Sequence, residues 1–420
     1  MKYAHLADLH LGSWRDEKMR ALSTKAFLQA LDKCEEEKVD FLIFAGDLFN
    51  TALPSLDTLK IVTRKLKYLH DKNIPLYAIA GSHDFSPSGK TMLDVLEQAG
   101  LLKNVCKGKV DPESKRLNLN FTIDQKTGVK LCGLLGRRGL LDRAYYENLN
   151  LQNLEEEPGY KIFMFHTTLT ELKPKHLEKL DSQPASFLPK NFNYYAGGHI
   201  HHPTKLELDN YGPLTYPGAL FPNNFGEMER YSKGGFYIIE VADKEKSDSA
   251  ELQLQKPQQQ ISWIPLEVIK HHHFELDCQN KSPAVISFEL NNHFNGLDLK
   301  DTLISLRLKG MLQQGRASDI EFKEVFEQLY QQGAYFIMKN TAELNTEAYE
   351  EINLSTGNSE SMEEEIIKEH LQQVTLFEKE RELNLTKSLL QALNTTKKEG
   401  ETVTDFNQRV EEETNRVLQI

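Results

Sequence analysis

Short apolar runs alternate with amphipathic stretches over roughly the first 240 residues. Five apolar runs predict buried strands, at Lys2–Ala7, Val39–Ala45, Pro75–Ala80, Val129–Leu135 and Lys161–Phe165. Amphipathic segments at Thr24–Glu37 and Ser55–Asp71 lie between the first three runs and predict helices. This β-α-β-α-β order indicates an α/β layered domain. Its later part is richer in strands and ends with the run at 234–241.

A polar stretch at 242–260 follows, with charged and Gln-rich parts. It marks a domain boundary, although a hairpin excursion also explains it. Beyond it the pattern predicts, in order, a strand, a helix, a strand and a helix, at Phe274–Cys278, Leu297–Leu303, Ile304–Leu312 and Phe322–Gln332. We therefore expect a first domain at 1–245 and a small α+β cap domain at 261–345.

The C-terminal part of the chain carries two amphipathic stretches, 361–394 and 403–420, after a loop-like segment at 352–360. Their apolar residues recur at spacings of three and four, as in Ile366, Ile367, Leu371, Val374, Leu389, Leu390, Leu393, Phe406, Val410 and Val417. Such acidic helices usually pack on their own domain. The polar lead-in and the distance from the first domain favour docking on another chain instead. We expect 361–420 to be a helical partner-binding segment.

Length and composition set broad limits. A chain of 420 residues predicts two or three domains, and 39% apolar with 27% charged residues is ordinary for a globular protein. No run approaches the roughly 18 consecutive apolar residues of a membrane span. The chain opens directly into the first predicted strand, without a secretory leader. We expect a cytoplasmic protein with no membrane partner.

Cysteines and net charge exclude some classes of function. The four cysteines form no C-x-x-C pair, so neither a disulfide framework nor a thiolate zinc site is expected. A net charge of −12 disfavours a general nucleic-acid coat protein, because phosphate binding depends on Lys and Arg. A nuclease stays compatible with this charge, since bound divalent cations supply local positive charge.

Polar motifs follow the predicted strands. In chain order they are Asp8-Leu9-His10, Gly46-Asp47, Gly81-Ser82-His83-Asp84, His166, and Gly198-His199-Ile200-His201. In an open α/β sheet, ligands bind outside the carboxyl ends of the strands, so all five motifs are expected at one edge. One such motif alone is explained by an ordinary turn. Five in order at one edge predict a shared site.

The residue types of these motifs suit a pair of metal ions. Carboxylates can bridge two cations, and imidazoles fill remaining positions while leaving room for water. Two cations about 3.5–4 Å apart activate a hydroxide and hold a phosphoryl oxygen during in-line displacement. No Ser-His-Asp nucleophile or thiolate centre competes with this prediction. The sequence therefore predicts a two-metal phosphoesterase.

The motif order DLH, GDLFN, GSHD, a strand-terminal His and GHIH resembles the calcineurin-like metallophosphoesterases. Within them, Ala7–Gly12, Ala45–Phe49 with Pro54, and Tyr216-Pro217-Gly218 before the 233–236 run resemble the Mre-eleven nuclease family, called SbcD in bacteria. The similarity covers 1–240 well, is weaker over 261–345, and is one of architecture only in the C-terminal helices. It implies a four-layer α/β metallophosphoesterase sandwich with a small α+β cap and C-terminal helices.

The resemblance also implies roles for single residues. One metal ion, by resemblance Mn²⁺, would be held by Asp8, His10, Asp47 and His201. The second would be held by Asp47, Ser82, His166 and His199. His83 would contact the scissile phosphate and protonate the leaving oxygen, with Asp84 orienting His83.

Two positions depart from the family pattern. Ser82 stands where the family usually has Asn, which leaves direct ligation by its shorter side chain open. Asn50 stands where some relatives have a His tied to exonuclease action, which leaves the balance between exonuclease and endonuclease open.

The function implied by resemblance is a metal-dependent DNA exonuclease or endonuclease in double-strand-break repair. Its partners would be double-stranded DNA ends, a Rad-fifty/SbcC-type coiled-coil ATPase bound by the C-terminal helices, and a second copy of the chain. Ser55–Asp71 or Lys90–Ala99 would form the homodimer contact. Arg137 and Arg138, in a glycine-flanked loop, would touch DNA phosphates, although a plain surface loop explains them equally well.

Two other functions fit the same residues. One is a small-molecule phosphomonoesterase or cyclic-nucleotide phosphodiesterase, which needs neither a DNA-sized groove nor tail helices. The other is a non-catalytic DNA-end tethering subunit whose metal site has decayed through Ser82.

Several other motifs do not predict sites. Gly89-Lys90-Thr91 lacks the glycine spacing of a phosphate-binding loop. His271-His272-His273 cannot face one ion from a strand, because alternate side chains point to opposite faces. His202 and His5 are better explained as a neighbour of a ligand and a structural residue of the first strand.

Overall fold

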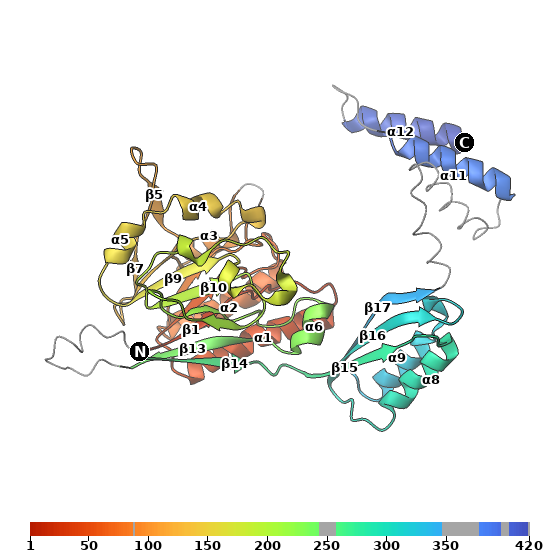
Figure 1. The fold of residues 1–420 in the computed structure, drawn as a ribbon, viewed down its shortest axis with the longest axis horizontal. Helices are drawn as coiled ribbons and strands as arrows, with labels where there is room; N and C mark the ends of the chain where they lie inside the picture. The colour runs from red at the N-terminus through yellow and green to blue at the C-terminus, as the bar shows by residue number, and fades with distance from the viewer. Residues whose placement is uncertain (87–88, 243–257, 347–377, 396–402, 419–420) are drawn as a thin grey trace. The chain divides into compact units, whose positions relative to one another are not determined.

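The computed structural model describes residues 1–86, 89–242, 258–346, 378–395 and 403–418. Two compact units divide the chain, Met1–Leu344 and Asn345–Ile420, and each is described by itself (Figure 1). The expected loop at 352–360 and the first part of the C-terminal helical segment, 361–377, lie outside the described residues.

The first sheet holds six strands in the order β14-β13-β1-β2-β3-β4. Their bounds are β1 Lys2–Leu6, β2 Phe41–Ala45, β3 Leu76–Ile79, β4 Lys103–Asn104, β13 Gly235–Val241 and β14 Gln259–Pro265. Strands β1 to β4 are parallel to one another, whereas β13 runs antiparallel to both β1 and β14. The carboxyl ends of β1, β2 and β3 therefore share one edge of the sheet.

Strands β13 and β14 flank the polar stretch at 242–260 and pair along their whole length, from Gly235 with Pro265 to Val241 with Gln259. This is the hairpin arrangement that the sequence left open. Residues 261–265 thus belong to the first sheet.

The second sheet also holds six strands, in the order β11-β12-β10-β9-β8-β7. Their bounds are β7 Thr122–Ile123, β8 Lys130–Gly133, β9 Lys161–His166, β10 Tyr194–Gly198, β11 Thr204–Leu206 and β12 Leu214–Tyr216. Strands β8, β9, β10 and β12 are parallel. A separate hairpin joins β5 (Gly108–Val110) to β6 (Leu117–Leu119).

The two sheets pack face to face around one apolar core. Tyr3, Phe41 and Tyr77 of the first sheet meet Ile162 and Tyr194 of the second, and all five are fully buried. Burying each such large side chain stabilises the fold by about 1.5–3 kcal/mol relative to leaving it in water. Because both faces of these strands are covered, their sequences are almost continuously apolar rather than alternating.

Helices cover the outer face of each sheet. On the first sheet these are α1 (Glu17–Glu36), α2 (Leu56–Asp71) and α3 (Met92–Gln98). On the second they are α4 (Arg143–Glu147) and α5 (Leu151–Glu156), with 3-10 turns η1 (Arg138–Leu140), η2 (Thr170–Leu172), η3 (Lys175–Leu177) and η4 (Ala185–Phe187). Helix α6 (Phe225–Tyr231) precedes β13. The predicted four-layer α/β sandwich is confirmed.

A smaller three-stranded sheet follows, in the order β15-β16-β17. It consists of β15 (Lys270–Asp277), β16 (Thr302–Leu312) and β17 (Phe336–Thr346), with helices α8 (Pro283–Phe294) and α9 (Phe322–Gln331) and the 3-10 turn η5 (Ala317–Asp319). Its own core includes Ile286, Leu290, Leu306, Val325 and Leu329. We call residues 270–344 the β15–β17 unit.

The helix predicted at Leu297–Leu303 is wrong. The helix lies earlier, at Pro283–Phe294, where proline stands in the first turn as helix starts favour. The chain then turns through Gly296 and Asp301, both with positive φ, into β16. Leu297, Leu299 and Leu303 are apolar positions of that turn and strand rather than one face of a helix.

The second unit contains two described helices, α11 (Lys379–Leu393) and α12 (Val403–Leu418), which contact each other. Leu390 and Leu393 of α11 stay 47% and 59% exposed. Within the described ranges, no helix combines the length and apolar content that crossing a membrane requires.

Candidate metal centre

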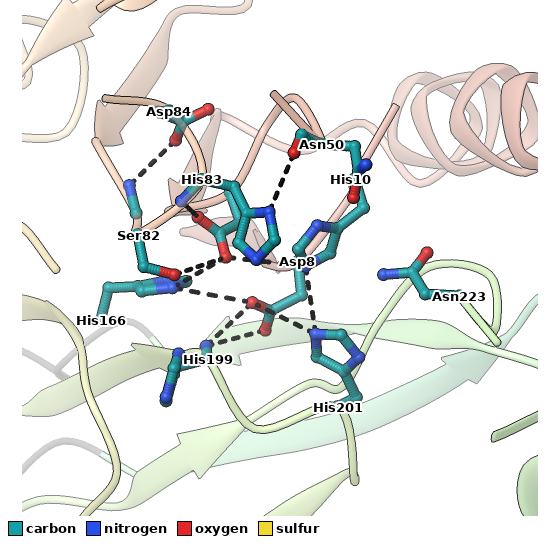
Figure 2. Close-up of polar contacts among 12 residues, drawn as sticks. Asp8, His10, Asn50, Ser82, His83, Asp84, His166, His199, His201 and Asn223 are labelled. Carbon is teal, nitrogen blue, oxygen red and sulfur yellow. Dashed lines mark hydrogen bonds and ion pairs between the residues drawn. The ribbon is translucent and has the colours of Figure 1, made fainter. Parts of the chain in front are cut away.

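The predicted site residues do not come from a single sheet edge as expected. They follow the carboxyl ends of β1, β2 and β3 in the first sheet and of β9 and β10 in the second, because the two sheets pack face to face (Figure 2). Strand β9 ends at His166, and β10 ends at Gly198, next to His199. Beside His83, the residues Asp8, His10, Asp47, His166 and His201 meet here, and we call these five the edge cluster. All are buried except His201, which is partly exposed.

Backbone conformation aims these side chains at the cluster. Asp8, His10, Asp47 and His199 have φ of 51°, 42°, 51° and 92°, in the left-handed region that residues with a Cβ seldom adopt. Each such residue costs about 1–3 kcal/mol. Hydrogen bonds from Asp8 N to Gly46 O (3.2 Å) and from His10 N to Asp47 O (3.0 Å) hold the two loops together. Strained residues concentrate where the chain bends at the strand ends.

Three motif glycines lie where no Cβ fits. A Cβ on Gly46 would lie 2.2 Å from Nδ1 of His166, and one on Gly81 would lie 2.2 Å from Oδ1 of Asp47. On Gly198 it would lie 2.0 Å from the Ala45 carbonyl oxygen. These glycines therefore let the backbone of one loop approach the site residues of another.

Asp47 lies between two histidines. Its Oδ2 is 3.1 Å from Nε2 of His166 and 3.6 Å from Nε2 of His10. Its Oδ1 accepts a hydrogen bond from the His83 backbone N–H at 2.7 Å, and Ser82 Oγ donates to Oδ2 at 3.4 Å. This placement fits the bridging role expected of Asp47.

Asp8 has a similar position. The backbone N–H of His199 donates to both of its carboxylate oxygens, at 2.9 and 3.0 Å. Its Oδ1 lies 4.0 Å from Nε2 of His166 and 4.0 Å from Nε2 of His201. Asp8 thus faces both histidines.

Hydrogen bonds fix the tautomers of His166 and His201. Nδ1 of His166 lies 2.8 Å from the Ala45 carbonyl, and Nδ1 of His201 lies 2.9 Å from Oε1 of Glu227. Both oxygens only accept, so each Nδ1 carries a proton, and in the neutral ring Nε2 keeps a lone pair. These lone pairs point at Asp47 and at Nε2 of His10, which is 3.1 Å from Nε2 of His201.

The Nε2 lone pair of His166 and the Asp47 carboxylate repel each other at 3.1 Å unless positive charge lies between them. His166 Nε2 and His10 Nδ1 are both buried without a hydrogen-bond partner. Histidines locked by a second acceptor, beside shared carboxylates, form the donor set of transition-metal sites. The residues present therefore fit divalent cations.

The pKa shifts show how strongly the cluster attracts positive charge. Burial alone lowers the pKa of His166, but Asp47 and Asp8 outweigh it and raise that pKa to about 10. Burial likewise lowers the pKa of His201, and Glu227 and Asp8 raise it to about 9. The pKa of Asp47 is low despite burial, because His166 and His10 stabilise its charge.

Three groups of potential ligand atoms lie within 4.8 Å of one another: Asp8, His10 and His201; Asp8, Asp47 and His166; and His10, Asp47 and His83. The first group holds three of the four residues expected for one ion. The second holds two of the four expected for the other ion, Asp47 and His166, together with Asp8. Among the described residues, His199 is in none of the three groups. Its ring centroid is 5.3 Å from that of His166, and in Figure 2 its side chain points away from the cluster.

His83 and Asp84 do not contact each other as the sequence suggested. Nδ1 of His83 lies 2.9 Å from the Asn50 carbonyl, and the other ring nitrogen points toward the cluster (Figure 2). The Asp84 carboxylate accepts from the backbone N–H groups of Phe49 and Gly81, at 3.1 and 2.9 Å. The Asn50 carbonyl therefore orients His83, and Asp84 holds two loops together.

The two loop arginines occupy different surroundings. Nη2 of Arg138 lies 3.2 Å from Nδ1 of His83, and the Arg138 side chain is exposed. The guanidinium carbon of Arg137 lies 5.1 Å from the centre of the Phe85 ring. Arg138 thus borders the site, whereas Arg137 packs on Phe85 and is partly buried.

Sequence reasoning missed Glu227 and the carbonyl of Asn50. Glu227 follows Asn224 by three residues, which is a signal for a helix start, and α6 does begin there. That signal does not reveal that the carboxylate reaches His201. A backbone carbonyl leaves no mark in a sequence, because every residue has one.

Sequence comparisons with known proteins indicate the same class of protein. A family model described as calcineurin-like phosphoesterase matches residues 1–203. A protein named DNA double-strand break repair protein Mre11, from Methanopyrus kandleri, is 29% identical over 254 residues, which is 57% of this chain and 54% of that protein. The protein of that name from Archaeoglobus fulgidus is 32% identical over 232 residues, 52% of this chain and 50% of the relative.

The protein of that name from Methanocaldococcus jannaschii is 30% identical over 270 residues, which is 59% of this chain and 66% of the relative. The chain spans about half the length of the first two relatives. The match with the phosphoesterase model ends shortly after His201, so it includes every predicted metal ligand. The chain belongs to the Mre11 (Mre-eleven) family of the calcineurin-like phosphoesterases.

Proposed function

We propose that the protein is a two-metal DNA nuclease, an exonuclease or endonuclease, that acts in double-strand-break repair. The observation that carries this proposal is the locking of His166 and His201 through Nδ1, which aims both Nε2 atoms at Asp8, Asp47 and His10. The relatives named for double-strand-break repair support DNA as the substrate.

Two divalent cations fit the edge cluster. Asp8, His10, Asp47 and His201 would hold one, and Asp47, His166 and Ser82 the other, which His199 would join by turning its ring toward the cluster. Mn²⁺ is the proposed ion, although carboxylate and imidazole ligands also accept iron, zinc or cobalt. When bound, such ions supply an activated water and positive charge at the phosphoryl oxygens.

The residues around the cluster position the substrate and move a proton. His83 donates from Nδ1 to the Asn50 carbonyl, which keeps its other ring nitrogen toward the cluster. In the doubly protonated ring, that nitrogen would give its proton to the departing oxygen of the DNA, which leaves a neutral ring with its remaining proton on Nδ1. Arg138, beside His83, would hold a neighbouring phosphate, and Arg137 would support the same loop. Asp84 would contribute by holding together the loops that contain Phe49 and Gly81.

Comparing two substrates tests the proposal. We expect cleavage of linear duplex DNA in Mn²⁺ with little turnover of a small phosphomonoester. Efficient turnover of the phosphomonoester or of a cyclic nucleotide, without cutting of duplex, would favour the small-molecule alternative.

The non-catalytic alternative has its own test. It predicts DNA binding that is unchanged in Asp47→Ala and His83→Ala, and no cutting by the wild-type protein. Under our proposal, the wild type cuts labelled duplex and both variants lose cutting while remaining folded.

We further propose that the protein forms a homodimer through α2 or the 90–99 segment. Near these elements, Leu53, Leu56 and Val95 are 78%, 83% and 56% exposed, which is unusual for large apolar side chains. Sedimentation velocity of the full chain tests this. We expect a dimer that Leu56→Asp weakens, and a concentration-independent monomer would contradict it.

The C-terminal helices are proposed to bind a Rad-fifty/SbcC-type ATPase. Exposed Leu390 and Leu393 on α11 support a docking face there. Co-purification of the ATPase with full-length protein, lost in Leu390→Asp with Leu393→Asp, is the expected result. A cytoplasmic location, with double-stranded DNA ends as the other partner, is part of the same proposal.

A further inference from the structure

Helix α6 is a short helix with acidic side chains that face two different neighbours. Glu227 contacts His201 of the edge cluster, and Glu229 contacts Arg307 of the β15–β17 unit. Between them in the sequence, Met228 is fully buried in the core over the first sheet. One helix of seven residues thus touches both a metal-ligand candidate and a separate sheet.

Glu227 is held by several donors. Its Oε1 accepts from Nδ1 of His201 at 2.9 Å and from Nδ2 of Asn224 at 2.7 Å, and its Oε2 accepts from the Asn223 backbone N–H at 2.8 Å. Asn224 in turn accepts from the Glu227 backbone N–H at 2.9 Å. The position of this carboxylate, and with it the ring of His201, is therefore set by the start of α6.

Glu229 ties the same helix to strand β16. Its two oxygens accept from Nε and Nη2 of Arg307, each at 2.6 Å, in a bidentate pair. Both side chains are largely buried, with 13% and 17% exposure, so solvent screens this pair less than a surface ion pair. The Arg307 guanidinium also lies 5.5 Å from the ring centre of Phe225, the first residue of α6.

The three consecutive histidines gain an explanation here. Nδ1 of His271 lies 3.0 Å from Oγ of Ser232, just past the end of α6, and Nε2 of His273 lies 3.7 Å from Glu229. His272 points to the other face of β15 and meets His293. The alternation that argued against a shared metal ion places two of the three histidines beside α6.

A helix this short is unstable without outside contacts, because forming the first turn costs more than its few hydrogen bonds return. The contacts that hold α6 are therefore its buried Met228, its cap at Asn224 and the grip of Arg307 on Glu229. Removing any of these contacts is expected to make α6, and with it the Glu227 side chain, more mobile.

We propose that α6 is a positioning element that links the β15–β17 unit to the metal centre. Arg307 fixes Glu229, the helix fixes Glu227, and Glu227 fixes Nε2 of His201 toward the cation position. Contact of the β15–β17 unit with α6 thereby raises the affinity for the metal ion that His201 would bind. This inference rests on the proposed metal centre, but it does not need DNA to be the substrate.

Calorimetric titration of the metal-free, full-length protein with Mn²⁺ tests the link. We expect Glu227→Gln to weaken one of two binding steps about 10- to 100-fold, because a partner that orients a metal-bound histidine is worth that much affinity. Arg307→Met is expected to weaken the same step by about 3- to 10-fold. Lys309→Met, which removes the β16 ion pair with Glu275 that does not contact α6, is the matched control and should leave both steps unchanged.

A charge exchange and a metal-free measurement complete the test. Arg307 also pairs with Glu343, so the charge exchange Glu229→Arg with Arg307→Glu is combined with Glu343→Gln and should recover most of the affinity lost in Arg307→Met. In metal-free protein, amide hydrogen exchange across 223–232 should rise in Arg307→Met and not in Lys309→Met.

Unchanged Mn²⁺ binding and unchanged exchange in Arg307→Met would overturn the link to the β15–β17 unit. Unchanged binding in Glu227→Gln would overturn the positioning role of Glu227. A protein that shows both expected changes but cuts no DNA would refute the proposed nuclease and support this inference.

Discussion

Two regions of the molecule are rich in histidine, and they differ in what surrounds the rings. In the edge cluster, His10, His166 and His201 lie beside the buried carboxylates of Asp8 and Asp47. In the β15–β17 unit, four histidines meet hydroxyls, aromatic rings and one another: His271, His272, His273 and His293.

The second region shows which contacts imidazoles make where no unpaired carboxylate lies beside them. His271 and His273 share the Ser305 hydroxyl, at 2.8 and 3.0 Å, and His293 stacks on Phe274 with ring centres 3.5 Å apart. The nearby acid, Glu229, is already paired with Arg307. A high density of histidine is therefore not enough for a metal centre. Shared carboxylates and locked tautomers make the difference.

The largest effect is expected when a shared carboxylate is removed from the edge cluster. Asp47→Asn keeps the size of the side chain but removes the negative charge between His166 and His10. We expect loss of tight Mn²⁺ binding and a fall in duplex cutting on the order of 1,000-fold, measured by calorimetry and gel assay. Asp298→Asn, an exposed acid paired with Lys270, is the control. Cutting within tenfold of wild type would contradict the importance of the carboxylate.

A second test separates metal binding from proton transfer. His83→Gln removes the ring that the Asn50 carbonyl orients, without touching Asp8 or Asp47. Cutting should fall by about 100- to 10,000-fold, the usual contribution of a positioned acid, while Mn²⁺ still binds in two steps. Loss of both Mn²⁺ steps would instead make His83 a ligand, as its proximity to His10 and Asp47 allows.

A third kind of histidine environment, that of His5, extends the comparison to the pH dependence of stability. His5 lies fully buried between the sheets, where it meets the Tyr194 and Thr215 hydroxyls, and burial lowers its pKa to about 3. Its unfolded pKa is about 6.5, so the unfolded chain binds the proton more readily between pH 6.5 and 3. The stability that neutral His5 contributes is complete above pH 6.5 and is lost as pH falls, by about 2 kcal/mol at pH 5.

Urea unfolding at pH 5 and 7.5 checks this expectation. His5→Asn should remove part of the loss of unfolding free energy between the two pH values, whatever its effect at pH 7.5. An identical pH dependence in wild type and His5→Asn would refute the prediction.

The smallest expected effect concerns the second histidine region itself. Nε2 of His272 lies 3.0 Å from Nε2 of His293, a pairing that looks like part of a metal site. Because no carboxylate is shared between them, His272→Asn with His293→Asn should leave the number of Mn²⁺ ions bound unchanged. Equilibrium dialysis with metal analysis measures this number, and a decrease would mean that imidazoles alone bind an ion here.

The sequence by itself predicted much of the fold and of the metal centre. Apolar runs marked the strands β1, β2, β3, β8 and β9 because strands buried on both faces have few polar positions. The motif residues were identifiable because the parallel strands of each sheet deliver their carboxyl ends to one edge, but only the packing of the two sheets brings these edges together. Glycines such as Gly46 and Gly81 belonged to the same short motifs because the close approach of Asp47 and His166 leaves no room for a Cβ.

Other features depended on contacts between distant parts of the chain, which only the tertiary structure decides. Glu227 reaches His201 across 26 positions, the Asn50 carbonyl reaches His83 across 33, and Arg307 reaches Glu229 across 78. Local patterns report which face of an element is buried, so they reveal ligands that one strand end presents. They do not indicate which backbone oxygen or distant charged side chain will lie opposite a given ligand, because tertiary packing decides this.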